Sequence, residues 1–596
     1  MKNQRTRRLI LFVLLFAISL NALTHVEVLA QRERVVPTPA LSSKPTLKIK
    51  PTPTPKPSPI ASPTPTPSPV VSPTPVATSI PASTLTSPKT IDDLQARIHE
   101  VLTRPGLARA QVGIKVVSLD SGKVLFEENA EKLYMPASNM KAYTIAAALD
   151  RLTPDYHFVT SVYATTKPDA NGVIKGNLMI EGGGDPTFAA SLNNGDYWKG
   201  TNELASRIAA AGVKKIEGDI VGNETFFAGS PLGFGWEWDD LQTYYGAEVS
   251  ALTINDNAID IFVKQGAKVG DACFITTGPP LPSSLLQIVN KTVTAQSGTP
   301  RRIVVTRKLG QNVVEVSGVV PIDDKRGFTG TVSIGNPALA FVYMLRAALA
   351  QKGITITGQS RTINSDDYLD NLLRLAKADP SLLSPNQLPM QAPNGDPRVV
   401  VATFQSPPLS EVAAKTMKPS QNLYTEIILR TLGERFGPVQ ENRDKILSGP
   451  KSSAEKGLEV VKQFLREAGI PEGSVEMYDG SGLSRHNLIT ASATVQLYAY
   501  MSRHRYAQAF RDALPIAGVD GTLSGRMKGT PAAGNLRAKT GTINQVAALS
   551  GYVTTAAGER LVFSILVNNL PDDSGIRRSY IDEIAVMLAS FTGKTQ

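Results

Sequence analysis

Cysteine is nearly absent from this chain, since Cys273 is the only one in 596 residues. A single thiol excludes a disulfide within the chain. Histidine is also scarce, and its five positions show no metal-ligand spacing, so we expect neither a metal nor another cofactor. The histidines are His25, His99, His157, His486 and His504.

Basic charge is missing from most of the chain, although the formal net charge is +10. Residues 1–30 carry a net +3 and residues 31–90 a net +6, which leaves +1 for residues 91–596. We therefore expect no nucleic-acid partner, because the excess charge belongs to the N-terminal segments. A basic segment fits contact with an anionic membrane or wall polymer, and equally a purely solubilising role.

The apolar run near the N-terminus is too short for a spanning helix, which wants ~20 apolar residues. It covers residues 9–17, follows Lys2, Arg5, Arg7 and Arg8, and precedes the small-residue site Val28-Leu29-Ala30. This pattern predicts a signal peptide over residues 1–30 and an exported protein, periplasmic or attached to the cell envelope. An uncleaved signal anchor is the alternative.

Residues 31–90 hold 16 of the 42 prolines, in Thr-Pro and Ser-Pro repeats. Proline fixes φ and has no N–H donor, so this composition predicts a disordered, extended linker. We expect membrane contact only through the leader or this basic tether.

The two ends of the remaining chain show similar patterns. Near its start we predict a helix at 91–102, strands at 111–117 and 123–127, and a helix at 138–149. Near its end we predict strands at 537–542, 546–555 and 561–568, and a helix at 576–591. Alternating strands at both ends, each with a helix outside, indicate one antiparallel sheet built from both.

Residues 161–395 have a different texture, with short β-like runs punctuated by Gly and Pro and one clear helix at 202–211. We interpret them as a large, mostly β insertion of one or two accessory domains. The predicted fold class is α/β (α+β), with an antiparallel sheet flanked by helices. The catalytic domain is then split into residues 91–160 and 396–596.

Ser138 and Lys141 are three residues apart at the start of a predicted helix. That spacing places both on one helix face, within hydrogen-bond reach. Lysine can take the proton of a serine only if its pKa falls from ~10.4 toward neutrality. We predict Ser138 as nucleophile and Lys141 as base. Ser453 and Lys456 have the same spacing, but no other motif accompanies them. We interpret them as residues of a solvated helix face.

Two further strings complete a possible acyl-transfer site. Ser420 and Asn422 precede a helical stretch, where Ser420 is suited to relay a proton and Asn422 to hold a substrate carbonyl. A helix cap is their ordinary meaning. Lys539-Thr540-Gly541-Thr542 lies on a plausible edge strand.

We expect this strand to bind substrate. Gly541 allows a substrate backbone to lie against it. Lys539 supplies charge for a terminal carboxylate and depresses the pKa of Lys141, and the Thr542 N–H completes an oxyanion hole with that of Ser138. Each string alone is weak evidence for a catalytic site. In isolation, Lys539-Thr540-Gly541 would indicate only an exposed lysine on a strand. The order of the strings along the chain is the stronger signal.

Over residues 91–596 the chain resembles the class C low-molecular-mass penicillin-binding proteins, the D-alanyl-D-alanine carboxypeptidase/endopeptidase family. Further strings resemble that family, and a long insertion between the first two motifs is its hallmark. They are Gly183-Gly184-Asp185-Pro186-Thr187, Tyr245-Gly246-Ala247, Asn255-Asp256-Asn257, Asp479–Asn487, and Leu549-Ser550-Gly551-Tyr552. Gln421 departs from the acidic residue that is frequent in the family.

The resemblance implies a serine peptidase that forms an acyl-enzyme on Ser138, acts on peptidoglycan stem peptides and cross-links, and binds β-lactams as inhibitors. A β-lactamase or esterase of the same fold is one alternative, and a non-catalytic wall-binding protein is another. We interpret Asp479–Asn487 as a Gly-rich turn beside the site, with Ser481, Ser484 and His486 as supporting candidates. Asp185 reads as a turn or cap, and Trp198, Trp236 and Trp238 as packing residues rather than a sugar platform.

Overall fold

The computed structural model describes residues 87–366, 398–438, 451–570 and 574–595. The predicted signal peptide and nearly all of the predicted linker lie outside these residues. Within the described part of the chain, no helix is both long and apolar enough to cross a membrane.

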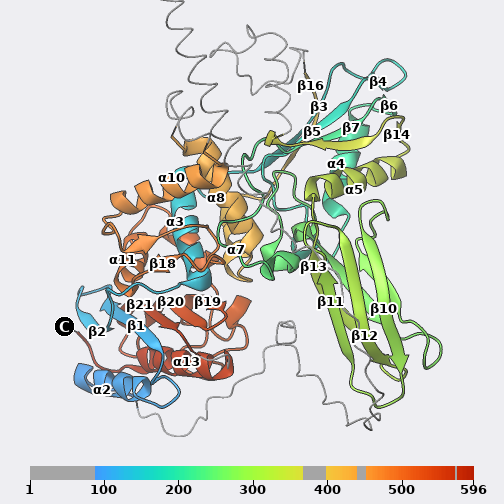
Figure 1. The fold of residues 1–596 in the computed structure, drawn as a ribbon. Helices are drawn as coiled ribbons and strands as arrows, with labels where there is room; N and C mark the ends of the chain where they lie inside the picture. The colour runs from blue at the N-terminus through green and yellow to red at the C-terminus, as the bar shows by residue number, and fades with distance from the viewer. Residues whose placement is uncertain (1–86, 367–397, 439–450, 571–573, 596) are drawn as a thin grey trace, which may run out of the picture. The chain divides into compact units, whose positions relative to one another are not determined.

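The central sheet is assembled from both ends of the chain, as predicted. Its five strands run in the order β19-β20-β21-β1-β2, and every neighbouring pair is antiparallel (Figure 1). They are β19 (Arg537–Ile543), β20 (Val546–Thr554), β21 (Arg560–Asn568), β1 (Gln111–Ser118) and β2 (Val124–Glu128). β19 is therefore an edge strand.

A separate apolar core covers each face of this sheet, because successive strand residues point to opposite faces. Leu549 and Ile565 pack in one core with α2 (Ile91–Leu102) and α13 (Ser574–Ser590). Ala548 and Leu566 pack in the other with six helices. These are α3 (Lys141–Leu152), α7 (Leu409–Met417), α8 (Asn422–Phe436), α10 (Ser453–Glu467), α11 (Ala491–Met501) and α12 (Ala507–Ala513).

The predicted helix at 138–149 begins later than expected. Ser138 lies in a short 3₁₀ turn, η1 (Ala137–Met140), and α3 starts at Lys141. Ala137 has φ +45°, in the left-handed region, so the chain turns sharply just before the serine.

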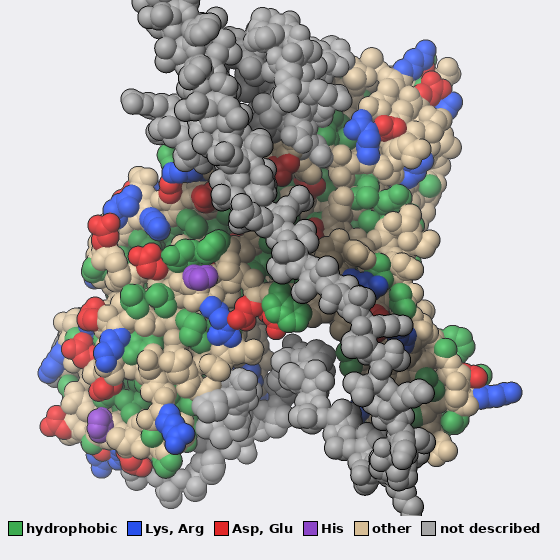
Figure 2. Space-filling model, viewed as in Figure 1, with side chains coloured by type: hydrophobic (Ala, Val, Ile, Leu, Met, Phe, Trp, Pro, Cys, Tyr) green, Lys and Arg blue, Asp and Glu red, His purple; other side chains and the backbone are tan. Residues whose placement is uncertain are grey.

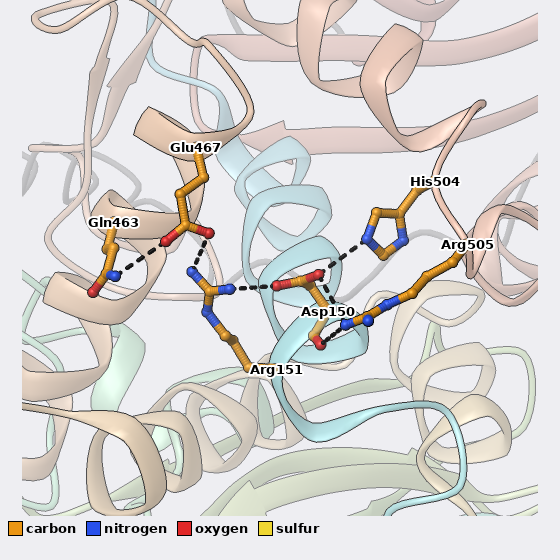
Figure 3. A network of polar contacts seen from close by, with 6 residues as sticks. All are labelled: Asp150, Arg151, Gln463, Glu467, His504 and Arg505. Atoms are coloured by element: carbon orange, nitrogen blue, oxygen red, sulfur yellow. Dashed lines mark hydrogen bonds and ion pairs between the residues drawn. The ribbon is translucent and has the colours of Figure 1, made fainter.

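The C-terminal end of α3 is fixed by polar contacts (Figure 3). Asp150 Oδ1 lies 3.0 Å from His504 Nε2, and the Arg151 guanidinium bonds both Asp150 and Glu467 at 2.6 Å. These contacts join α3 to α10 and to the segment after α11, so the helix that begins with Lys141 is held at its far end.

The insertion has its own apolar core. Its largest sheet runs β15 (Ser360–Ile363), β7 (Ile220–Asn223), β5 (Leu178–Glu181), β3 (Val159–Ala164) and β16 (Val399–Gln405). The strand β16, which we expected in the catalytic half at 396–596, instead pairs with β3 in this inserted sheet.

Three smaller sheets complete the described part of the insertion. They are β10 (Gln287–Ala295)–β12 (Val313–Pro321)–β11 (Arg302–Arg307), β13 (Phe328–Ser333)–β8 (Ala258–Lys264)–β9 (Phe274–Gly278), and β14 (Thr355–Ile356)–β6 (Lys215–Glu217)–β4 (Val173–Lys175). The predicted helix is α4 (Lys199–Ala210), and a second helix, α5 (Pro337–Gln351), was not predicted.

Charges of both signs are interspersed on the face shown in Figure 2, where Lys and Arg side chains lie among Asp and Glu outside the grey residues. This distribution agrees with the near-neutral charge of residues 91–596 in the sequence.

Candidate active site

Ser138 and Lys141 contact one another at the junction of η1 and α3. Lys141 Nζ lies 2.8 Å from Ser138 Oγ. The serine is partly exposed, whereas the lysine side chain is fully buried. A substrate can therefore reach the hydroxyl while the amine stays shielded from water.

The Lys141 amine makes two further short contacts, to Asn422 Oδ1 at 2.6 Å and to the Ser481 carbonyl at 2.8 Å. Burial lowers the pKa of Lys141 to about 7, and the negative charges of Asp479 and Glu426 oppose that shift. The amine is thus available as a proton acceptor near neutrality. We expected Lys539 to contribute to this lowering, but burial is the cause, and the charges that act on Lys141 are those of the two carboxylates.

The second string lies at the start of α8. Gln421 is its N-cap and accepts from the Leu423 N–H at 3.2 Å. Ser420 adopts φ +67°, a left-handed conformation that bends the chain into the site. Asn422 is buried, and its amide donates to the Tyr245 carbonyl at 3.0 Å. Asn422 therefore joins the base to the insertion, in addition to any contact with a substrate carbonyl.

Lys539 is fully buried on the edge strand β19, where we had allowed for an exposed lysine. Its Nζ donates to Ser420 Oγ at 2.8 Å and to the Thr540 carbonyl at 3.0 Å. Burial, and then the charge of Lys141, hold the pKa of Lys539 well below its usual value.

The other residues of this strand differ in their surroundings. A Cβ on Gly541 would lie 2.5 Å from the Pro136 carbonyl oxygen, so the glycine lets β19 pack against the turn that carries Ser138. The Thr540 hydroxyl bonds Thr522 Oγ1 at 2.8 Å, whereas the Thr540 carbonyl accepts from Lys539. Thr542 is exposed beside them.

The turn Asp479–Asn487 contacts Lys141 through the Ser481 carbonyl. Two features of this turn were not predicted. The first is the Ser481 carbonyl, since a backbone acceptor leaves no signal in sequence. The second is the buried Asp479 carboxylate, which accepts from the Gly482 and Ser484 N–H groups at 2.8 and 2.7 Å. Gly482 has φ +84°, and a Cβ there would lie 1.8 Å from the Ala137 carbonyl oxygen.

The insertion contacts α8 through its own signature strings. Tyr424 donates to Asp256 of the Asn255–Asn257 turn, and lies 3.1 Å from Ser191 Oγ. A Cβ on Gly184 would lie 3.3 Å from side-chain atoms of Ile427 and Thr431. The inserted residues therefore buttress the helix that begins with Asn422.

The remaining singled-out residues have mostly structural contacts. Asp185 caps the Thr187 N–H at 2.8 Å. Trp198 packs on the insertion core and Trp236 donates to Asp479, whereas Trp238 is 69% exposed and is not a packing residue. Ser453 of the second Ser-x-x-Lys string is buried and bonds Glu434, so it is not on a solvated face.

A hollow of about 700 Å³ lies elsewhere, between α2 and β2. It is lined by Asp92, Gln95, Ala96, His99 and the strand residues 124–127. None of the three motif strings contributes to it, so we do not assign the site there.

Known proteins resemble this chain along nearly all of its described length. A family model described as the D-Ala-D-Ala carboxypeptidase 3 (S13) family matches residues 94–379 and 386–590. A D-alanyl-D-alanine carboxypeptidase of Actinomadura sp. (strain R39) is 30% identical over 514 residues, 84% of this chain and 86% of that protein. The D-alanyl-D-alanine carboxypeptidase DacB of Haemophilus influenzae is 26% identical over 462 residues, 77% and 85% of the two chains.

The fold is shared with a solved structure. The crystal structure of penicillin binding protein 4 (dacB) from Haemophilus influenzae superposes with a TM-score of 0.64 at 23% identity, and covers 83% of this chain and 99% of that one. The family model spans both halves of the central sheet and the insertion between them. This chain therefore belongs to the D-Ala-D-Ala carboxypeptidase 3 (S13) family.

Proposed function

We propose that the chain hydrolyses D-alanyl-D-alanine peptides through an acyl-enzyme on Ser138, with Lys141 as the base. The contact that supports this most directly is the 2.8 Å distance between Lys141 Nζ and Ser138 Oγ, made by a buried amine whose pKa is lowered to about 7. A buried amine of normal pKa would stay protonated and could not take the serine proton.

The reaction follows from these contacts. Ser138 Oγ attacks the carbonyl carbon between the two D-residues, and its proton passes to Lys141 Nζ. The oxyanion is stabilised by the N–H groups of Ser138 and Thr542. The C–N bond then breaks, and the leaving amine takes a proton from Lys141, directly or through the Ser420 hydroxyl. Water hydrolyses the resulting ester.

Lys539 serves the terminal carboxylate of the substrate in this proposal. Burial and the charge of Lys141 disfavour its protonated form in the free protein. A bound carboxylate supplies the missing counter-charge, so Lys539 takes up a proton when substrate binds. Ser420, which already accepts from Lys539 at 2.8 Å, is itself partly exposed, whereas the lysine is buried.

We further propose cleavage of peptidoglycan cross-links and acylation by β-lactams, because both present a carbonyl and a carboxylate to the same groups. A β-lactamase or esterase predicts rapid release of bound penicillin, whereas a peptidase retains it. The family match favours the peptidase. A non-catalytic wall-binding protein has no need for a serine beside an amine of lowered pKa.

Labelling with fluorescent penicillin tests the nucleophile. We expect labelling of the wild type and of Ser453→Ala, which alters the second Ser-x-x-Lys string, but none of Ser138→Ala. Persistent labelling of Ser138→Ala would refute the assignment. Digestion of purified muropeptides then separates release of terminal D-alanine from cleavage of cross-links.

We also propose that the protein is exported by residues 1–30 and held on the tether 31–90, with the catalytic domain at about 91–157 and 407–595 and the insertion between them. The leader pattern in the sequence supports export, and the pairing of β16 with β3 supports these boundaries. Mass spectrometry of the mature N-terminus tests cleavage after Ala30.

A further inference from the structure

Two buried carboxylates lie behind the Lys141 amine. Glu426 and Asp479 are each 1% exposed, and the charge of each acts on Lys141. Neither carboxylate has a part in the reaction proposed above. A buried carboxylate is unfavourable unless it is bonded and charge-compensated, so each requires a reason for its position.

Glu426 is linked to Lys141, the proposed base, through the turn Asp479–Asn487. It lies one helical turn after Asn422 on α8, so both face the same side. Its Oε1 accepts from the Gly480 N–H at 3.0 Å and from the Ser481 N–H at 2.8 Å. The carbonyl of Ser481 in turn accepts from Lys141 at 2.8 Å. Glu426 thereby fixes the position of Ser481, whose carbonyl contacts Lys141.

The charged groups around Glu426 come from three elements: Arg430 lies one turn further along α8, Asp479 lies in the turn, and Lys141 begins α3. Lys141 in turn acts on the buried Lys539 of β19. Burial and then the charge of Asp479 raise the pKa of Glu426 to about 7, while Arg430 opposes that shift. Asp479 is bonded to the Trp236 indole, the Asn487 amide and two backbone N–H groups.

We propose that Glu426 is a positioning residue for the acyl transfer: it anchors the turn that presents the Ser481 carbonyl to Lys141, and its charge sets the pH at which Lys141 accepts the serine proton. This inference deepens the proposed function and rests on it. A buried amine without a nearby negative charge loses its proton at still lower pH and becomes a weaker base. Because Lys141 and Glu426 interact, the midpoint of the pH profile is an apparent pKa of the two groups together, and a change at Glu426 should move it.

The test compares pH profiles of acylation by fluorescent penicillin. Glu426→Gln keeps an oxygen acceptor for the two N–H groups but removes the charge. We expect the acidic limb of its profile to move to lower pH by about one unit. A merely structural role lowers the rate at every pH without moving the midpoint. Glu434→Gln is the matched control, because it removes a carboxylate from the same helix that bonds Ser453 and Lys456 instead. Its profile should match that of the wild type.

A Glu426→Gln profile that superimposes on that of the wild type would overturn the inference. If this variant is not recovered folded, Glu426→Asp decides, because it keeps the charge and shortens the reach. It should also move the acidic limb to lower pH, by less than about one unit, because the shorter side chain withdraws the charge from Lys141. An unmoved midpoint would also overturn the inference. Failure of the wild type to label through Ser138 would instead refute the proposed function, so the two failures are distinguishable.

Discussion

Lys141 Nζ lies 2.6 Å from Asn422 Oδ1, although 281 residues separate them in the chain. This contact crosses from α3 to α8, and the other end of the Asn422 amide bonds the insertion at Tyr245. One side chain thus holds the base and is itself held by the inserted residues. Asn422→Ala should slow acylation by penicillin about 100-fold. Stopped-flow labelling measures this, with Asn535→Ala as the control, which loses the amide contacts between the loop before β19 and Thr554 at the end of β20.

Lys141→Arg should abolish acylation between pH 5 and 9, because a guanidinium stays protonated and cannot accept the serine proton. The expected loss is at least about 1,000-fold in rate. Lys456→Arg, in the second Ser-x-x-Lys string, should keep wild-type activity, since Lys456 only pairs with Glu434. Measurable acylation in Lys141→Arg would mean that another group serves as the base.

Tyr424→Phe tests the buttress between the insertion and α8. It leaves the half-buried Asp256 without the Tyr424 hydroxyl, which should lower the free energy of unfolding by about 1 to 3 kcal/mol. Acylation should also slow, because α8 carries Asn422. Tyr143→Phe, which loses a bond to Thr494 on α11, is the control: it should be destabilised similarly without a comparable loss of rate. Equal rate losses in both variants would contradict a specific role for the insertion.

Gly482→Ala should disrupt the site, because its Cβ would overlap the Ala137 carbonyl oxygen beside the nucleophile. We expect a loss of about 3 kcal/mol or more in stability, together with loss of labelling. Gly534→Ala has a similar positive φ, +73°, but open space around its Cβ. It should be destabilised by only about 1 kcal/mol. Thermal and denaturant unfolding of both variants measures the difference.

Asp185 should make stability depend on pH. Burial raises its pKa to about 7 in the folded protein, and its Oδ2 has no hydrogen-bond partner among the residues that the structure describes. Its contribution is present below its unfolded pKa of about 3.9 and is lost as the pH rises through about 7, by up to about 4 kcal/mol. Asp185→Asn should therefore unfold with a smaller pH dependence than the wild type between pH 5 and 8. An identical dependence in urea unfolding would contradict this.

The central sheet was predictable because its strands and helices carry strong local patterns. The predicted helix at 91–102 and the hairpins at both ends of the chain are confirmed. The sequence also places Ser138 and Lys141 within reach of each other by spacing alone. The prediction that Asn422 on α8 and Lys539 on β19 join them rested on the order of the motifs, because a single sequence gives no direct signal of contact between distant segments.

Other features were not predicted, for identifiable reasons. The helix α5 is apolar around most of its surface and so lacks an amphipathic period, although Asn336 and Pro337 form a recognisable start. Burial of Lys539 cannot be read from a single strand residue. Glu426 was within reach of sequence reasoning, because it is four residues from Asn422 on one helix, but its function depends on a turn more than 50 residues away.

The strand order β19-β20-β21-β1-β2 has a consequence for biogenesis. The strand β1 has a neighbour from the C-terminal hairpin, so a nascent chain that ends before residue 537 cannot close the sheet, and its serine has no Lys539 opposite it. Pairing between strands distant in sequence slows folding. The edge of β1 that pairs with β21 stays unpaired and prone to aggregation until the C-terminal strands are synthesised. The contact between Lys539 and Ser420 can therefore form only after β19 has been synthesised.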